Sequence, residues 1–444
     1  MPELEVEFFG IINGMMKRFP LVARIMVGFV AGTLLGLSMS EWCTKETIAS
    51  VLSWVSPFGA VLVAMLKAVV YPIILFSLVS GAASLPLRKS GRVGGAVLIW
   101  YTATSLAATV FGVLLAYAAN PSAAGFNSLA ASHLAGAKAL TSGGGAKSMA
   151  EFLTGLFQNP FSALAEGQFL PVIVFAISFG LAARSILDAL DDKRGETARS
   201  ISALLDAVNG AQRISFKLID WTMLYFPIGV FALATTNFAT NGTLLFGPYI
   251  RIILSIMLGV GAMILVIYPL AIAVFCRENP YKLFLRLRET LLTAFVTRSS
   301  AATLPMSFRA MDSMGVDRAL SGFSLPLGAT VNMDGVCIHL PVFVILAANM
   351  FGLDLSILQI ATLCISIMFA SVGAGGIPGG SLFLLFMVLE NMGLAADQVM
   401  VVVALALGIN PILDMFETCC NVAGDNVCTY IVARKSGLVK SERA

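Results

Sequence analysis

Four carboxylates lie in the apolar last third of this 444-residue chain, where an ionised side chain is costly. Asp334 belongs to the motif NMDG, and Asp414, Glu417 and Asp425 lie together in a later apolar segment. On membrane-insertion scales each such residue costs about 2.5–3.5 kcal/mol, so four cost on the order of 10 kcal/mol. Arg298 is the one basic residue at a comparable position, and one arginine cannot satisfy four carboxylates. Bound cations, a substrate ammonium or protons must therefore supply the missing positive charge.

Polar side chains share one face of the final apolar segment. A spacing of i, i+3, i+4, i+7 and i+11 groups them on a helix: Asp414, Glu417, Thr418, Asn421 and Asp425. NMDG adds an amide and a carboxylate two residues apart, with a glycine that we expect to let the helix unwind. Unwound carbonyls together with Asn and Asp oxygens suit a small hard cation. These residues therefore predict a cation site near a substrate site.

The elements that must position these residues are interrupted apolar segments. Between 283 and 433 the chain is broken by TRSSAATLP, LPLGATVNMDG, SVGAGGIPGGS and GINPILDMFETCCNVAGD. Backbone that leaves a helix at membrane depth is tolerated only where protein buries it or a cavity wets it. Two hairpins, broken at Ser299–Ser300 and at Gly373–Gly380, each precede a long span, at 316–347 and 396–433, as in the inverted repeats of transporters. If these small residues served only close helix packing, the nearby charges would stay unexplained.

Composition places the chain in a membrane. Apolar residues make up 58% and charged residues 12%, whereas soluble domains have about 45–50% and about 25%. A net charge of +3 forms no continuous basic surface, which argues against nucleic-acid binding. Seven cysteines without C-x-x-C spacing disfavour a zinc site or a disulfide framework. Because the chain has no H-E-x-x-H, G-x-S-x-G or Walker A motif, we do not expect an enzyme.

Hydropathy and charge predict the topology of an all-α membrane protein. Six further apolar segments bring the predicted spans to eight: 21–40, 52–84, 93–118, 150–187, 200–236 and 244–276. If two re-entrant hairpins return to the side of the membrane that they left, nearly all Lys and Arg residues of the loops lie on one side of the membrane. The loops on the other side carry only Lys45, Lys138 and Lys147. The positive-inside rule then places both termini in the cytoplasm. The acidic N-terminus is unlike a secretory signal, so the first span is expected to be retained, and 119–149 to be a flexible external loop.

The four motifs that interrupt the apolar segments resemble, in this order, motifs of the family of sodium-coupled dicarboxylate and amino-acid symporters. FSLVSGAASLP, NPFSALAEGQFLPVIVFA and FPIGVFALATT agree too, so the resemblance covers nearly the whole chain. It implies a homotrimer in the plasma (inner) membrane, with a static scaffold and a transport domain that moves like an elevator. Residues 1–92, with an N-terminal amphipathic segment, and 150–236 would be mostly scaffold. Residues 237–444, with the third span and its external loop in 93–149, would supply the transport domain.

The resemblance also implies two or three sodium sites in the transport domain. The first site would use the backbone carbonyls of Gly328, Asn332 and Asn421 with the Asp425 carboxylate. The second would use the backbone carbonyls of Thr330, Ser371, Val372 and Ala374. The third would use Asp334 and Asn332 together with Tyr101, Thr104 and Ser105. For Tyr101, Thr104 and Ser105, the sequence alone favours ordinary helix packing.

The implied substrate site uses both hairpins and the last span. The substrate carboxylate would meet Ser299, Ser300 and Asn421, and its ammonium would meet Asp414 and Thr418. The second hairpin would form the gate through Ile377, Pro378 and Gly379.

Two departures from the acidic-substrate members bear on the substrate. Those members have an arginine where this chain has Glu417, because a guanidinium grips a side-chain carboxylate, and a threonine where it has Val336. D-x-x-E-T is instead similar to bacterial serine/threonine symporters of the family. Glu417 could accept a hydrogen bond from a substrate hydroxyl, pair with a cationic side chain, or line an alanine pocket in protonated form. We expect sodium-coupled import of small neutral amino acids; alternatives are a cationic substrate or an anion-conducting, channel-like member.

His339 stands where many members have an aromatic residue. A packed neutral histidine and a titrating role in coupling both stay open. The adjacent Cys419 and Cys420 are interpreted as small packing residues rather than redox groups.

Overall fold

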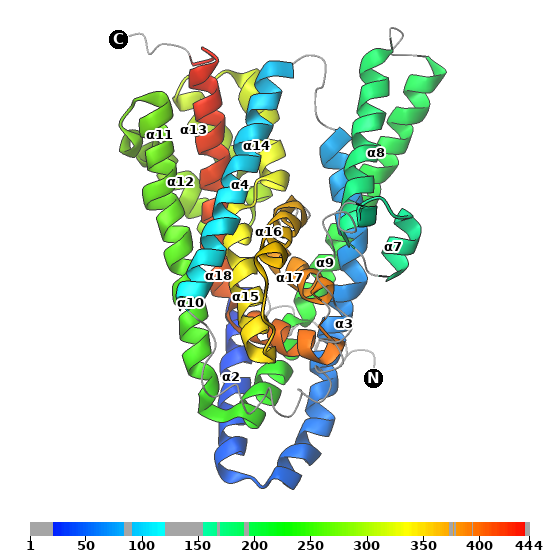
Figure 1. Ribbon diagram of the computed structural model, residues 1–444, viewed down its shortest axis with the longest axis vertical. Helices are drawn as coiled ribbons and strands as arrows, with labels where there is room; N and C mark the ends of the chain where they lie inside the picture. The colour runs from blue at the N-terminus through cyan, green and yellow to red at the C-terminus, as the bar shows by residue number, and fades with distance from the viewer. Residues whose placement is uncertain are drawn as a thin grey trace, which may run out of the picture.

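The protein is almost wholly helical in the part of the chain that the computed structural model describes (Figure 1). The described residues are 21–83, 91–119, 154–166, 169–190, 195–372, 376, 379–392 and 394–439. The predicted external loop, the N-terminal segment, Ala374, Ile377 and Pro378 lie outside them. One isolated antiparallel β-bridge joins Val316 to Val439.

Eight helices of the described chain are long and apolar enough to cross a membrane, which confirms the predicted number. The first five are formed by α2 (Leu21–Trp42), α3 (Lys45–Ala83), α4 (Gly91–Ala119), α8 (Phe169–Ala189) and α9 (Glu196–Asn241). The sixth joins α10 (Phe246–Ala262) to α11 (Tyr268–Cys276) through a π-helical turn, Met263–Ile267. The last two contain α14 (Arg318–Val331) with α15 (Asp334–Phe351), and α18 (Ala396–Lys435).

The fourth span begins later than its apolar segment suggested. Residues 160–166 form a separate short helix, α7 (Pro160–Glu166), and the helix of the span, α8, starts only at Phe169. The Asn159 side chain accepts a hydrogen bond from the backbone N–H of Phe161 at 2.9 Å, and Pro160 follows it. An Asn cap followed by proline starts a new helix, so the apolar run divides there.

Two pairs of shorter helices flank the motifs TRSSAATLP and SVGAGGIPGGS. α12 (Pro280–Thr297) packs against α13 (Ser300–Ser313), and α16 (Ile357–Ser371) against α17 (Gly380–Asn391). The first pair breaks one residue earlier than expected, at Arg298 and Ser299. Arg298 has a left-handed φ of 53°, and the Ser299 side chain caps α13 by accepting from the N–H of Ala302 at 3.2 Å. The re-entrant path of both pairs stays a prediction.

NMDG breaks the seventh span as expected, but not through its glycine. The helix stops at Val331 and resumes at Asp334, so Asn332 and Met333 form the break. Gly335 is helical instead, and a Cβ there would lie 2.5 Å from the carbonyl oxygen of Glu417. The expected unwinding role of Gly335 is therefore wrong: this glycine lets α15 approach α18.

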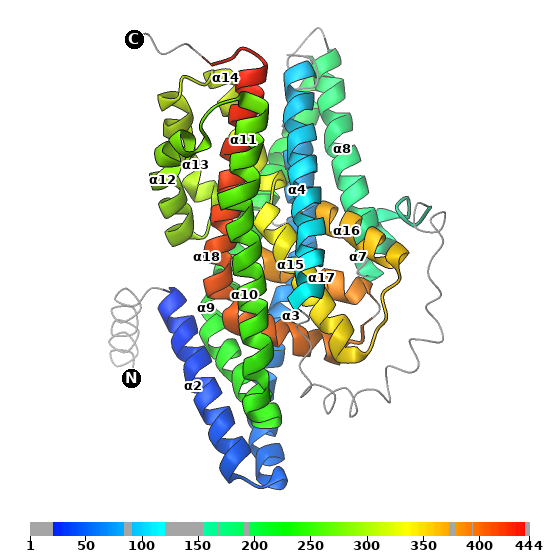
Figure 2. The same ribbon diagram turned by 60° about the vertical axis from the view of Figure 1, so that its left-hand side comes forward.

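The helices form two packed groups (Figure 2). α9 packs against α2 and α3, and α3 packs against α8. Gly28, Gly32 and Gly36 line the α2 surface, and a Cβ on each would lie 2.4–2.7 Å from a carbonyl oxygen of α9. Such small-residue stripes bring helix backbones close together. In the second group, α18 contacts α4, α10 to α15 and α17, and it also contacts α9 and α2 of the first group.

Candidate substrate and cation site

Asp334 is fully buried at the start of α15 and is held from two other helices. Ser105 of α4 donates to its Oδ1 at 2.8 Å, and the Tyr268 hydroxyl of α11 donates to its Oδ2 at 2.6 Å. The sequence analysis missed Tyr268. The sequence feature that points to Tyr268 is its phenol in a very apolar span, because a buried O–H requires a hydrogen-bond partner.

Asn332 links Asp425 to α4. Its side-chain oxygen accepts from Thr104 at 3.1 Å, and its amide nitrogen donates to Asp425 Oδ1 at 3.1 Å. The hydroxyl of Tyr101 donates to the carbonyl of Ser324 at 2.9 Å. Thr104 and Ser105 thus lie beside Asn332 and Asp334, and the part of Tyr101, Thr104 and Ser105 in a cation site stays a prediction.

In the part of the chain that the structure describes, no basic side chain balances Asp334 or Asp425. Within the described chain, their side-chain partners are hydroxyl and amide groups, and no lysine or arginine reaches them. No three His, Cys, Asp or Glu residues of that part converge as a transition-metal site would require. Hard oxygen donors around uncompensated carboxylates fit an alkali cation better.

Two glycines leave space for this cluster. A Cβ on Gly328 would lie 2.5 Å from Asp425 Oδ1 and 2.7 Å from the Tyr101 hydroxyl. A Cβ on Gly424, which the sequence analysis missed, would lie 2.7 Å from the Tyr268 hydroxyl. Both helices therefore approach the polar groups with bare backbone, as carbonyl coordination requires.

Replacing Gly328 with alanine should raise the half-saturating sodium concentration by about tenfold or more, because the added methyl displaces the Asp425 carboxylate. A tenfold loss of sodium affinity corresponds to about 1.4 kcal/mol of binding free energy. Sodium-dependent thermal stabilisation of the purified protein measures this. Gly322→Ala is the matched control, since it lies on the same helix with nothing within 4 Å of its Cβ position. Equal sodium affinities in the two variants would contradict the assignment.

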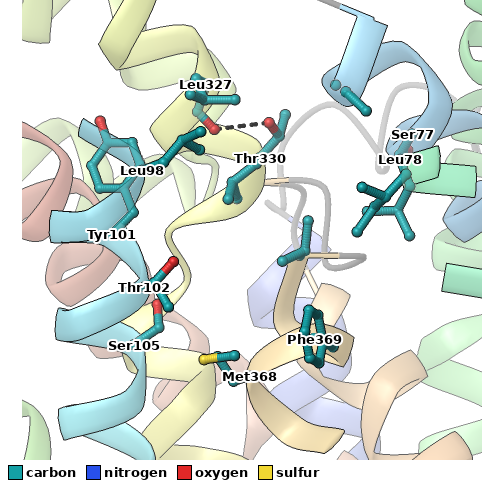
Figure 3. Close-up of a pocket in the computed structure, with 15 residues that line it drawn as sticks. Ser77, Leu78, Leu98, Tyr101, Thr102, Ser105, Leu327, Thr330, Met368 and Phe369 are labelled. Atoms are coloured by element: carbon teal, nitrogen blue, oxygen red, sulfur yellow. Dashed lines mark hydrogen bonds between the residues drawn. The ribbon is translucent and has the colours of Figure 1, made fainter. Parts of the chain in front are cut away.

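Of the residues implied for a second sodium ion, Thr330 and Val372 line one cavity, and Ala374 lies outside the described residues. This mostly apolar cavity of about 170 Å³ lies between α3 and α8 on one side and α4, α14 and α16 on the other (Figure 3). The Thr330 hydroxyl donates to the Leu327 carbonyl at 2.9 Å, and Ser371 is buried and bonded within its own helix. This ion site stays a prediction.

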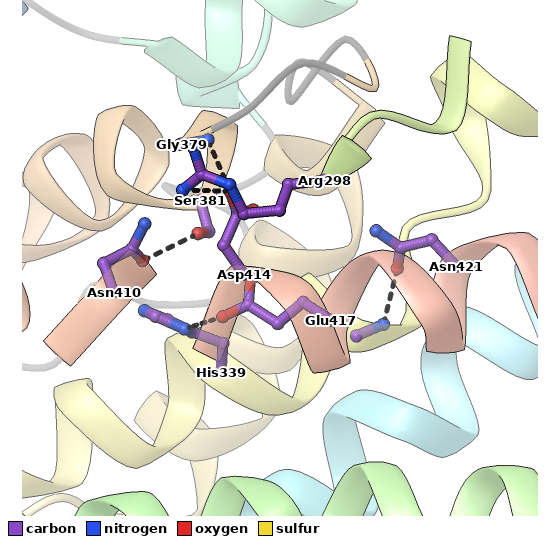
Figure 4. Close-up of polar contacts among 9 residues, drawn as sticks. Arg298, His339, Gly379, Ser381, Asn410, Asp414, Glu417 and Asn421 are labelled. Atoms are coloured by element: carbon purple, nitrogen blue, oxygen red, sulfur yellow. Dashed lines mark hydrogen bonds and ion pairs between the residues drawn. The ribbon is translucent and has the colours of Figure 1, made fainter. Parts of the chain in front are cut away.

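Asp414 lies where the two hairpins meet α18 (Figure 4). Its Oδ2 accepts a hydrogen bond from the backbone N–H of Gly379 at 3.0 Å and lies 3.5 Å from an Arg298 guanidinium nitrogen. Among the described residues, Oδ1 has no hydrogen-bond partner. The arginine and one oxygen thus hold the carboxylate in place, while the other oxygen can accept from an ammonium.

The tips of the two hairpins touch each other. Ser299 donates from its hydroxyl to the Gly376 carbonyl at 3.0 Å. A Cβ on Gly376 would lie 3.3 Å from the Cβ of Ser300. The Ser300 hydroxyl is buried and has no partner within the described chain, so it can donate to a substrate carboxylate.

The remaining predicted substrate residues surround this position. Asn421 accepts through its side-chain oxygen from the Gly335 N–H at 2.7 Å, which ties α18 to α15. Thr418 and Val336 are buried. Cys419 and Cys420 are also buried and free, and the Cys419 thiol donates to a carbonyl of α12, which supports their interpretation as packing residues.

Glu417 has an unexpected partner. His339 of α15 contacts its Oε1 through Nδ1, and both side chains are buried (Figure 4). Glu417 Oε2 and His339 Nε2 have no hydrogen-bond partner within the described chain. The two residues lie 78 positions apart, and no sequence pattern pairs them.

The sequence model of one protein family, described as the sodium:dicarboxylate symporter family, matches residues 21–435. The chain belongs to this family. Membership makes it a symporter rather than an enzyme, and its apolar helices make it a multi-pass membrane protein.

Three curated members of the family are similar over most of their length. The serine/threonine transporter SstT of Bifidobacterium adolescentis is 33% identical over 91% of this chain and 87% of its own. The neutral amino acid transporter B(0) of Homo sapiens is 31% identical over 91% and 78%. The proton/glutamate-aspartate symporter of Escherichia coli is 28% identical over 94% and 93%. The family is therefore shown, while its members differ in substrate and coupling ion.

Proposed function

We propose that this protein is a sodium-coupled symporter that imports small neutral amino acids, serine first, across the plasma (inner) membrane. The observation that carries the proposal is the charge of the buried site. Among the described residues its only arginine, Arg298, forms an ion pair with Asp414, and the resemblance places Glu417 where acidic-substrate members have arginine. The names of the serine/threonine and neutral amino acid transporters support this substrate class.

Sodium is the coupling ion that the cluster around Asp334 and Asp425 supports. Two buried carboxylates with only neutral donors call for bound cations, and hydroxyl, amide and carbonyl oxygens are ligands for hard ions. The family description supports sodium in the same way. The number of ions, two or three, is part of the proposal.

The substrate would span the two hairpin tips and α18. Its carboxylate would accept from the buried Ser300 hydroxyl and from Asn421, and its ammonium would donate to Asp414 and Thr418. A serine hydroxyl would then donate to Glu417. The partnerless Ser300 hydroxyl and Glu417 Oε2 support these two contacts, because buried polar atoms require partners.

Transport would follow an elevator mechanism in a homotrimer with both termini in the cytoplasm. Residues 1–92 and 150–236 would form mostly the scaffold, and the helices around α18 would move. The glycine-tight contacts of α2 with α9 support a rigid scaffold. The apolar cavity lies between the two helix groups, which supports an interface along which one group can move past the other.

Uptake of labelled serine into proteoliposomes tests the proposal. An inward sodium gradient should drive accumulation, and unlabelled alanine should compete while aspartate and lysine should not. Replacing sodium with potassium at the same membrane potential is the control. Uptake driven by a proton gradient without sodium would refute sodium coupling. Strong lysine uptake would favour the cationic-substrate alternative, and flux without saturation would favour a channel.

Replacing Glu417 with arginine should abolish serine uptake and give some aspartate binding. The guanidinium removes the acceptor for the hydroxyl and supplies a partner for a side-chain carboxylate. The gain should be incomplete because Val336 provides no hydroxyl. Competition assays measure the change, with Glu417→Gln as the control that removes the charge without adding one. Aspartate competing as well as alanine in the unmodified protein would contradict the role of Glu417.

A further inference from the structure

His339 is a buried titratable residue to which the proposed transport cycle gives no role. Its side chain is 0% exposed and that of Glu417 is 1% exposed, and the two are in direct contact. The imidazole also stacks on Phe343, with ring centroids 4.8 Å apart and planes inclined by 30°. The ring is thus fixed on one side by an aromatic residue and on the other by the carboxylate.

Within the described chain, His339 is the only side chain that pairs with Glu417. Arg298 forms an ion pair with Asp414, and Asp414 lies one turn before Glu417 on α18. No lysine or arginine of the described chain forms an ion pair with Glu417. A buried carboxylate without a counter-charge is strongly disfavoured. A proton added to the pair makes it neutral overall, whether the proton resides on the imidazole or on the carboxyl group. His339 therefore balances Glu417 as Arg298 balances Asp414.

We propose that His339 is a specificity-determining residue of this transporter. A proton shared within the pair makes it neutral, and the contact with Nδ1 holds Oε1, which leaves Oε2 as a single acceptor for a substrate hydroxyl. The site then binds zwitterionic amino acids with a small uncharged side chain and rejects cationic ones. This inference rests on the proposed function and explains why a carboxylate in the substrate site does not select lysine.

Replacing His339 with phenylalanine tests the proposal directly. Phenylalanine keeps the aromatic contact with Phe343 and removes the nitrogen that meets Glu417. In proteoliposomes, the unpaired Glu417 should then attract cationic side chains, so lysine should inhibit sodium-driven serine uptake at least tenfold more strongly. The KM for serine should rise, because the carboxylate is no longer held in place.

Two further variants separate this role from simple packing. His339→Phe combined with Glu417→Gln removes the unpaired charge but keeps an amide oxygen as acceptor, so the double variant should reject lysine and recover serine affinity relative to His339→Phe. His339→Asn keeps an N–H near Glu417 Oε1 without the titratable ring. It should keep a serine KM close to that of the unmodified protein and still gain inhibition by lysine.

The outcomes distinguish this inference from the proposed function. If the unmodified protein shows no sodium-driven uptake of neutral amino acids, the proposed function fails and the inference fails with it. If that uptake is present, an unchanged serine-to-lysine selectivity in both His339 variants overturns the inference alone. An equal loss of both amino acids that Glu417→Gln does not reverse overturns it as well, because it marks His339 as a packing residue.

Discussion

Replacing Asp414 with alanine should lower amino-acid affinity by at least about 100-fold while sodium binding stays measurable. Asp414 is the carboxylate that we assign to the substrate ammonium, and its Oδ1 has no partner among the described residues. Loss of one member of a buried, hydrogen-bonded charge pair costs about 2–5 kcal/mol. Isothermal titration of serine in saturating sodium measures the loss, and sodium-dependent thermal stabilisation measures the remaining ion binding.

Two further variants make the result interpretable. Asp414→Asn keeps an acceptor for the Gly379 N–H but removes the charge, so it should lose the substrate as well. Asp312→Ala removes a carboxylate from an exposed ion pair with Arg318 and should leave affinity unchanged, because exposed pairs contribute little. If serine affinity survived in either Asp414 variant, the ammonium would have to bind elsewhere.

Replacing Asp425 with asparagine should abolish concentrative uptake at physiological sodium. An amide can still accept from the Asn332 side chain, but it removes one of the two buried charges that call for sodium. We expect sodium affinity to fall on the order of 100-fold, equivalent to about 2.7 kcal/mol. Because ion and substrate binding are linked, serine affinity at fixed sodium should fall too.

Sodium titration distinguishes coupling from damage. Raising the sodium concentration should restore serine affinity in Asp425→Asn, whereas potassium should not. Asp312→Asn, an exposed change of the same type, is the control. A variant with unchanged sodium dependence would show that Asp425 does not contribute to the ion site.

The linear sequence was sufficient for the number of helical spans and for the approximate positions of the breaks at NMDG and in the two hairpins. Hydropathy is a local property, and a helix in lipid satisfies its backbone internally, so each apolar segment carries its own signal. The break at NMDG and the two hairpin breaks follow from residues within each segment. The face of α18 that carries Asp414 to Asp425 also follows, because residues three or four apart on one helix are neighbours in any fold.

Contacts between helices were decided only by the tertiary structure. Tyr268 and Gly424 lie beside Asp334, yet Tyr268 lies in an apolar span without a functional signal, and within the last polar motif nothing singled out Gly424. Gly335 serves close packing of α15 on α18 rather than unwinding. His339 and Glu417 are 78 residues apart, and they meet because these two helices cross at that point. Periodicity orders residues along one helix, whereas a partner on another helix depends on the packing of the whole chain.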